Sequence, residues 1–219
     1  MNILLGRTSP RCNIKEVEEQ KLPCDVLRPK HYQEYTAFQI IRKFFIQHIE
    51  YSHLVLASDD IVVKPKDITQ LAIDLIMKND PVICGMMNVD EKDYPNGRLA
   101  IAYELPDKMW GDYKWLKRSD LHKNIDIFPV EFNGFCLMSI RRDIIERYEF
   151  KADTVLRGGT DPAFGGSYDL VFCWWCKENG IPIYVDKRID MVHLRQSGKL
   201  DVNSNPETIL IKNGIEIKL

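Results

Sequence analysis

The sequence predicts an α/β fold in which helices flank a mostly parallel central sheet. Short apolar runs alternate with amphipathic helical patterns along most of the chain, which is typical of strand–helix–strand units. The 219 residues, of which 45% are hydrophobic and 28% charged, suit a single globular domain. Asn213-Gly214 stands between two runs that alternate apolar and polar residues. This pattern predicts a β-hairpin at the C-terminal end.

Strands are expected where apolar runs are short, and helices where apolar residues recur at every third or fourth position. The expected strands are Asn2–Leu5, Asp25–Leu27, Leu54–Ala57, Val82–Met87, Leu99–Tyr103, Val130–Phe132, Phe135–Ile140, Ile181–Val185, Thr208–Lys212 and Ile215–Leu219. The expected helices are Tyr32–Glu50, Asp67–Lys78, Arg141–Tyr148 and Asp169–Glu178. Pro29 should end the second strand. Ile49 should lie on the apolar face of the first helix, and Ile73 and Ile76 on that of the second, which Asp67 should cap.

Composition argues against several classes of partner. The net charge of −2 provides no general attraction to nucleic acid or to an anionic membrane. No apolar run approaches the roughly 18 residues that span a bilayer. Gly6 and Arg7 interrupt the first apolar run too early for a secretory signal. Cys84, Cys136 and Cys173 lie in apolar stretches, where a free thiol behaves as a small hydrophobic side chain. We therefore expect a cytoplasmic protein with reduced cysteines and no nucleic-acid partner.

Cys173-Trp174-Trp175-Cys176 has the C-x-x-C spacing of some redox and zinc sites. Redox activity requires the first cysteine at the start of a helix, where its pKa falls. Asp169 holds that place here, one turn earlier. We expect both cysteines to pack in the core.

Two adjacent acids, Asp59 and Asp60, follow an apolar strand. Ligands of open α/β sheets bind at the carboxyl ends of strands, and adjacent carboxylates repel each other unless a positive charge compensates. Carboxylate oxygens suit Mg²⁺ or Mn²⁺, with a diphosphate completing the coordination. A simple turn is the alternative explanation, because Asp is common in turns.

Asp169 stands at the predicted start of a helix, directly after a segment that contains Gly165-Gly166. The helix dipole favours the ionised carboxylate there, which suits a general base. The alternative is a carboxylate that only caps its helix. His193 follows a further strand, where it is either a structural residue or a ligand.

A third group runs from Asn133-Gly134 to Arg141-Arg142. Glycine lets a ligand approach the backbone closely, although a β-bulge would explain the same pattern.

The chain between residues 88 and 125 is polar and is expected to form a mobile loop. Its interleaved aromatic residues would either stack on a sugar or pack onto the domain: Trp110, Tyr113 and Trp115. Its basic residues would either form a solvated face or contact a diphosphate: Lys114, Lys117, Arg118, His122 and Lys123.

In this order and spacing, the three groups resemble the GT-A fold of nucleotide-sugar glycosyltransferases. Leu54–Pro65 resembles the strand that carries the family's Asp-x-Asp metal motif. Asn133–Arg142 resembles the strand with a small-residue turn at the acceptor site, and Gly166–Gly180 the helix whose first acid is the base in inverting members. The segment Arg7–Arg11 resembles the first strand-to-loop turn near the nucleotide base. The similarity covers residues 1–195.

The resemblance implies a hexosyltransferase-like enzyme that uses Mn²⁺ or Mg²⁺. Its donor would be a UDP- or GDP-sugar, and its acceptor a glycan, a lipid or a protein. The metal ligands would be Asp60, Asp59 and His193. The donor would contact Arg7, Ser9, Asp59 and Gly134. Asp169 would remove the acceptor proton, with inversion of the anomeric centre.

The sequence departs from the family pattern in two places. Ala57 and Ser58 stand where the first acid of Asp-x-Asp belongs, so Asp60 is the better candidate for the metal and Asp59 for the ribose or donor sugar. Tyr168 replaces the acidic neighbour of the expected base.

The resemblance also suggests how one domain over residues 1–219 is divided. Residues 1–87 would bind the nucleotide, 88–125 form a lid, 126–195 carry the acceptor and catalytic residues, and 196–219 form a hairpin tail. A sugar-phosphate nucleotidyltransferase and a non-catalytic carbohydrate-binding module remain alternatives. The first would carry a glycine-rich loop with Arg and Lys after the first strand, and Gly6–Pro10 matches this poorly.

Overall fold

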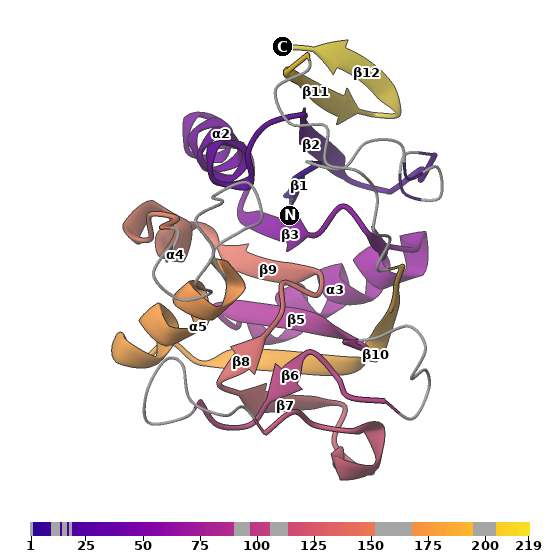
Figure 1. Cartoon of the computed structure of the whole chain (residues 1–219), viewed down its shortest axis with the longest axis vertical. Coiled ribbons are helices and arrows are strands. Elements are labelled where there is room, and N and C mark those ends of the chain that lie inside the picture. Colours follow the sequence, from indigo (N-terminus) through magenta and orange to yellow (C-terminus); the bar gives the residue numbers. More distant parts are fainter. Residues whose placement is uncertain are drawn as a thin grey trace.

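The computed structural model in Figure 1 has a ten-stranded sheet with helices on both faces. It describes residues 2–9, 14, 17, 19–89, 97–105, 114–151, 168–194 and 205–219. Along the sheet the strands follow the order β12-β11-β2-β1-β3-β9-β5-β10-β4, and β7 also pairs with β10. A separate two-stranded sheet joins β6 and β8.

The strands are β1 (Ile3–Arg7), β2 (Asp25–Lys30), β3 (His53–Ala57), β4 (Ile61–Val62), β5 (Val82–Met87), β6 (Ile101–Ala102), β7 (Ile127–Val130), β8 (Phe132–Asn133), β9 (Met138–Arg141), β10 (Ile183–His193), β11 (Glu207–Lys212) and β12 (Ile215–Lys218). The helices are α2 (Glu34–Gln47), α3 (Pro65–Lys78), α4 (Arg142–Arg147) and α5 (Tyr168–Glu178).

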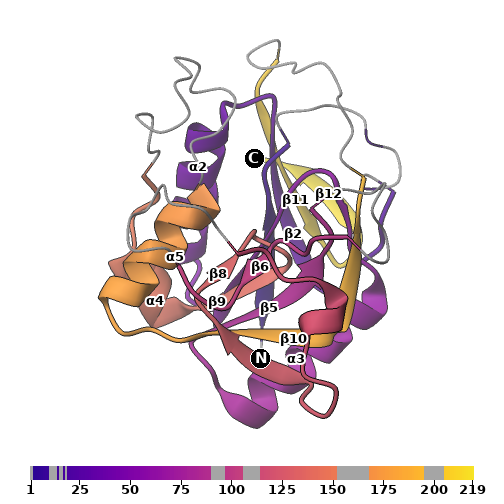
Figure 2. The same ribbon diagram turned by 60° about the horizontal axis from the view of Figure 1, so that its bottom comes forward.

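The two faces of the sheet carry separate hydrophobic cores. On one face, buried side chains of α2, α4 and α5, among them Phe38, Ile144 and Phe172, pack in a single cluster with Leu4 and Leu54 of the sheet. On the other face, α3 packs against the opposite sides of the same strands. Figures 1 and 2 show α4 and α5 on one side of the sheet and α3 on the other. The result is a three-layer α/β/α arrangement.

The expected mostly parallel sheet is wrong, because the sheet is mixed. The parallel neighbours are β1–β2, β1–β3 and β5–β10. The antiparallel neighbours are β3–β9, β5–β9, β10–β4, β10–β7, β11–β2 and β11–β12. A helix that crosses over the sheet returns the chain for a parallel strand. In the described parts of residues 88–137, the helical structure is one 3-10 turn, Arg118–Asp120. The large sheet then continues with β9, which is antiparallel to both β3 and β5.

Several expected boundaries also change. Pro29 does not end its strand: β2 continues to Lys30, and the Pro29 carbonyl accepts a hydrogen bond from the Ser9 N–H at 3.2 Å. Ile49 lies beyond α2 and is 85% exposed. Ile73 and Ile76 lie on the outer side of α3, at 48% and 68% exposure.

Other local expectations are confirmed. Asp67 caps α3 from its third position, where its carboxylate accepts the Lys64 N–H at 2.8 Å. Gly180 follows α5 with φ +64°, as expected of a helix-ending glycine. Cys173 and Cys176 are buried free thiols, and burial raises the pKa of each.

No helix in the described ranges is long and apolar enough to span a bilayer.

A buried acidic pair links an irregular segment of β10 to α3. The register of β10 against β5 shifts between Val185 and Asp190, and Asp186 inside this segment is fully buried. Arg188 donates to both oxygens of Asp186 and, at 2.8 Å, to Oδ1 of Asp74 on α3. Burial, a hydrogen bond with Asp186 and the charge of Asp186 together raise the pKa of Asp74 to about 7. Asp74 therefore keeps its proton to a higher pH than an exposed carboxyl group does.

We predict that Asp74→Asn flattens the pH dependence of stability between about pH 4 and pH 7. Because the pKa of Asp74 is higher in the folded protein than the roughly 3.9 of an unfolded Asp, the folded state binds more protons. The free energy of unfolding therefore falls as pH rises through this window. Asparagine still accepts from Arg188 but does not titrate. Urea unfolding at four pH values measures the slope. The exposed Asp143→Asn serves as the control, and equal slopes in all three proteins would contradict the prediction.

Candidate functional site

The predicted site residues gather at one edge of the sheet. The strands β1, β2, β3, β5 and β10 run parallel to one another, so their carboxyl ends meet at this edge, here called the carboxyl edge. Because β9 is antiparallel, the turn before it lies there too. The edge thus brings together Arg7, the pair Asp59–Asp60, Gly134 and His193.

The two adjacent acids are buried near an arginine. Asp59 is 5% exposed and Asp60 is 3% exposed. Arg7, at the end of β1, is 1% exposed, and its guanidinium donates to the Ile61 carbonyl at 3.2 Å. Burial and the nearby Arg28 lower the pKa of Arg7 to about 10, while attraction to Asp59 and Asp60 opposes this shift. Arg7 therefore places a buried positive charge near both acids.

His193, at the end of β10, is hydrogen-bonded to Asp60, which lies just before β4. His193 lies opposite Ile61 in the β10–β4 pairing, and its Nε2 is 3.2 Å from Oδ2 of Asp60. Burial alone would lower the pKa of His193. The Asp60 carboxylate and the nearby carbonyls of Asn88 and Val89 outweigh this effect and raise it. The Leu194 N–H also donates to the Asp60 carbonyl at 2.8 Å, so the end of β10 fixes this acid at two points.

These residues fit a divalent cation only when a ligand supplies further oxygens. The described residues contain no group of three or more His, Cys, Asp or Glu side chains that could hold a metal ion. Mg²⁺ and Mn²⁺ sites that bind diphosphates commonly use one or two protein carboxylates, and Asp59 and Asp60 match that number. His193 is hydrogen-bonded to Asp60. Residues that hydrogen-bond to a metal ligand in this way orient that ligand.

A constrained turn connects β8 to β9 at this edge. Phe135 and Leu137 both have positive φ, at 47° and 49°, which costs of order 1 kcal/mol or more for each such residue. Asn133, fully buried, stabilises the turn: its amide donates to the Gly85 carbonyl at 2.9 Å, and its Oδ1 accepts the Cys136 N–H at 3.0 Å. The turn is thus tied to β5.

Asp169 meets this turn at Gly134. Oδ1 of Asp169 accepts the Leu170 N–H at 2.8 Å. A methyl group added to Gly134 would lie 3.5 Å from Oδ2 and 3.1 Å from Cβ of Ala100. The glycine therefore lets the turn, Ala100 and the Asp169 carboxylate approach one another closely. Asp169 itself is half-buried in the first turn of α5, where the helix dipole favours its ionised form.

Ser9 lies beside β2 at the same edge. It forms an isolated bridge with Lys30, and its carbonyl accepts the His31 N–H at 3.1 Å. Ser9 is 7% exposed. Its backbone contacts with Lys30 and His31 position the end of β2.

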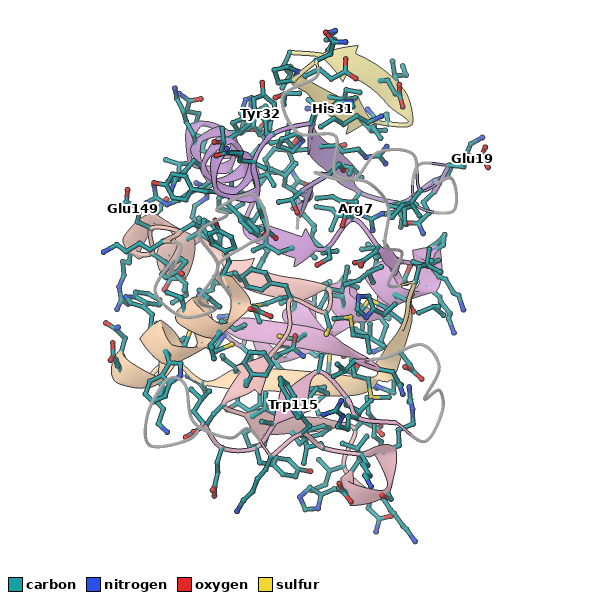
Figure 3. The ribbon with its side chains drawn as sticks, viewed as in Figure 1. Arg7, Glu19, His31, Tyr32, Trp115 and Glu149 are labelled. Carbon is teal, nitrogen blue, oxygen red and sulfur yellow. The ribbon has the colours of Figure 1, made fainter. Side chains whose placement is uncertain are left out.

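The expected lid is partly fixed to the sheet. Arg118 donates through both terminal nitrogens to Asp190 at 2.8 Å, and also to the Asn88 side chain at 2.9 Å. Trp115 packs edge-on against Phe132, with 5.3 Å between ring centroids. In Figure 3 it lies well away from Arg7. Of the basic stretch, Arg118 is therefore a structural ion-pair partner. Trp110 and Tyr113, and the Gly165-Gly166 segment, lie outside the described residues.

A cavity of about 640 Å³ opens away from this edge. Its lining includes Ile3, Asp25 and Tyr51, at the amino ends of the parallel strands, and Lys212 of the hairpin. The Tyr51 hydroxyl donates to Asp25 at 2.7 Å. We place the functional site at the carboxyl edge because the paired acids, the histidine and the strained turn lie there.

Comparison with known proteins supports the architecture alone. No family model matches the chain, and no curated protein matches its sequence. Among solved structures, A197 from STIV is similar with a TM-score of 0.50 over 100% of this chain and 90% of that chain. The sequence identity is 13%, so the likeness concerns the fold.

Sequence reasoning missed two polar groups of this edge. Asn133 was interpreted only through its glycine neighbour, and its side chain proves to join two strands. Asn88 follows β5 as Asp59 follows β3, and the same strand-end signal could have identified it. Its amide meets Arg118.

We predict that Asn133→Ala lowers the free energy of unfolding by about 2–4 kcal/mol. The change leaves the Gly85 carbonyl and the Cys136 N–H buried without these bonds, and each such loss costs roughly 1–3 kcal/mol. Chemical denaturation measures the effect, with the exposed Asn124→Ala as a control. A loss below 0.5 kcal/mol, roughly that of an ordinary surface change, would show that the turn does not depend on Asn133.

Proposed function

We propose that the protein is a metal-dependent glycosyltransferase that moves a sugar from a nucleotide-sugar donor to a hydroxyl acceptor. One observation carries the proposal. A buried acidic pair at a strand end and a helix-start carboxylate facing a glycine occupy the same edge of the sheet. The resemblance of the three sequence groups to nucleotide-sugar glycosyltransferases supports the same chemistry.

The acidic pair suits the donor diphosphate. Asp60 and Asp59 would hold Mg²⁺ or Mn²⁺, which supplies positive charge for the leaving diphosphate. His193 keeps Asp60 in place through its hydrogen bond at 3.2 Å. Arg7 carries a positive charge near both acids, which reduces their mutual repulsion. Asp59 would also accept hydrogen bonds from the ribose or the donor sugar.

Asp169 is the proposed general base. Its Oδ1 is held by the Leu170 N–H, and its Oδ2 lies close to Gly134. An acceptor hydroxyl bound to Oδ2 would transfer its proton to this oxygen as its own oxygen forms a bond to the anomeric carbon. The bond from that carbon to the diphosphate oxygen breaks, and its electron pair leaves with the nucleotide. Direct attack of this kind inverts the anomeric centre.

Two other classes differ in what they would produce. A sugar-phosphate nucleotidyltransferase would release pyrophosphate from a nucleoside triphosphate. A carbohydrate-binding module would give no product. Product analysis with a panel of UDP- and GDP-sugars therefore separates all three functions.

We predict that Asp169→Asn lowers turnover by roughly 10²–10⁴-fold, the usual contribution of a general base, and leaves the melting temperature nearly unchanged. Asparagine retains the shape of the side chain and can still accept the Leu170 N–H. Donor hydrolysis or transfer is measured together with thermal unfolding.

The matched control is Asp143→Asn. Asp143 also lies in the first turn of a helix, α4, but α4 follows β9 and so starts at the opposite edge of the sheet. Full turnover in Asp169→Asn would remove Asp169 from the mechanism. The anomeric configuration of the product, determined by NMR, would then show whether the reaction is retaining.

A further inference from the structure

Within the part of the chain that the structure describes, the strand β12 forms an open end of the large sheet. It is last in the strand order and pairs with β11 on one side. Figure 1 shows the β11–β12 hairpin at the outer end of the sheet, next to the C-terminus. Three large apolar side chains here are exposed: Ile215 at 67%, Ile217 at 42% and Leu219 at 58%. Exposed edges of this kind favour pairing with another strand.

The hairpin geometry determines which backbone groups face outward. The turn residues Asn213 and Gly214 have φ values of 53° and 77°, as in a two-residue type I′ hairpin. The Leu219 N–H donates to the Thr208 carbonyl at 2.9 Å. Because inward-facing groups alternate along an antiparallel strand, Ile215 and Ile217 also face β11. The N–H and C=O groups of Glu216 and Lys218 point outward.

These outward groups are self-complementary in one register. When two copies of β12 pair antiparallel about Ile217, Glu216 of each copy lies opposite Lys218 of the other. Both residues point their backbone groups to the partner strand, so the pairing forms four N–H···O=C bonds. The same register places opposite charges side by side twice, which stabilises cross-strand pairs.

The apolar side chains match in the same register. Ile217 of one copy meets Ile217 of the other, and Ile215 meets Leu219. All of them lie on the face of the sheet shared with Leu210, which is opposite Ile217 and belongs to the core. Pairing would extend this apolar row across the two copies.

We propose that β12 is a homodimer interface in which two copies of this chain join their sheets edge to edge about a two-fold axis. The assignment is independent of the chemistry at the carboxyl edge. Lys218 also contacts Glu207 of its own chain at 3.0 Å and remains 74% exposed, so its ammonium can lie between two carboxylates. A pairing of these few residues buries less surface than the 1,200–2,000 Å² of stable interfaces. The dimer is therefore concentration-dependent.

Charge reversal at the two outward positions provides the test. Glu216→Lys places Lys opposite Lys at both pairs, and Lys218→Glu places Glu opposite Glu. We expect each variant to sediment as a monomer at concentrations where the wild-type chain self-associates. An equimolar mixture of the two variants restores both opposite-charge pairs and should associate again, as should the double variant E216K/K218E.

Thermal unfolding of each variant shows that the exposed substitutions leave the fold intact. A mixture that behaves as the two single variants do, or a wild-type chain that remains monomeric across the concentration series, would overturn the proposal. Association that is unchanged in both single variants would place any dimer elsewhere on the surface.

A disulfide checks the register. Ile217→Cys should form a covalent dimer under mild oxidation, because residues directly opposite each other have Cα atoms about 4.5–5.5 Å apart, within disulfide reach. Glu216→Cys should crosslink far less, since its counterpart is diagonal, and the wild-type chain gives the baseline. Equal crosslinking of the two variants would contradict this register.

Discussion

The burial of two adjacent carboxylates at the carboxyl edge constrains much of the surrounding structure. A buried charge is costly unless it is paired and hydrogen-bonded. Arg7 at the end of β1 and His193 at the end of β10 supply this compensation. The acids thus join two strands that are distant in the sheet order. This explains why an arginine that could have contacted a ligand is instead almost fully buried.

Local elements of the fold could be predicted because their signals are local. The apolar run at Val82–Met87 gave a strand with the expected bounds, and Asn213-Gly214 gave the hairpin. Strand direction could not be predicted, because it depends on long connections rather than on the strands. The chain after β5 passes through β6, β7 and β8 before β9 enters antiparallel. The full length of β10 was hidden by the charged residues Asp186–Arg188. In the structure Arg188 pairs with Asp186 and with Asp74 of α3, and Lys187 pairs with Asp126.

Site residues could be predicted where the end of a strand could be predicted. The expected positions of Asp59 and Asp60 followed from their strand, whereas that of His193 rested on the family resemblance, and the structure brings Asp60 and His193 together. The burial of Asp60, which is 3% exposed, could not be predicted from its place after a strand. The approach of Asp169 to Gly134 depends on tertiary packing of α5 against the turn, and no sequence spacing specifies it. The role of Asn133 was missed for the same reason.

Calorimetric titration of nucleoside diphosphates in the presence and absence of Mn²⁺ tests the central claim most directly, with the wild-type protein and Asp60→Asn compared. Asparagine preserves the shape next to His193 but removes the charge. The account predicts that the wild-type chain binds UDP or GDP more tightly with Mn²⁺. It also predicts that Asp60→Asn loses this gain by at least about tenfold, in line with losses seen when metal-site groups are removed. Identical metal-dependent affinities in the two proteins, or no nucleotide binding by the wild-type chain, would contradict it.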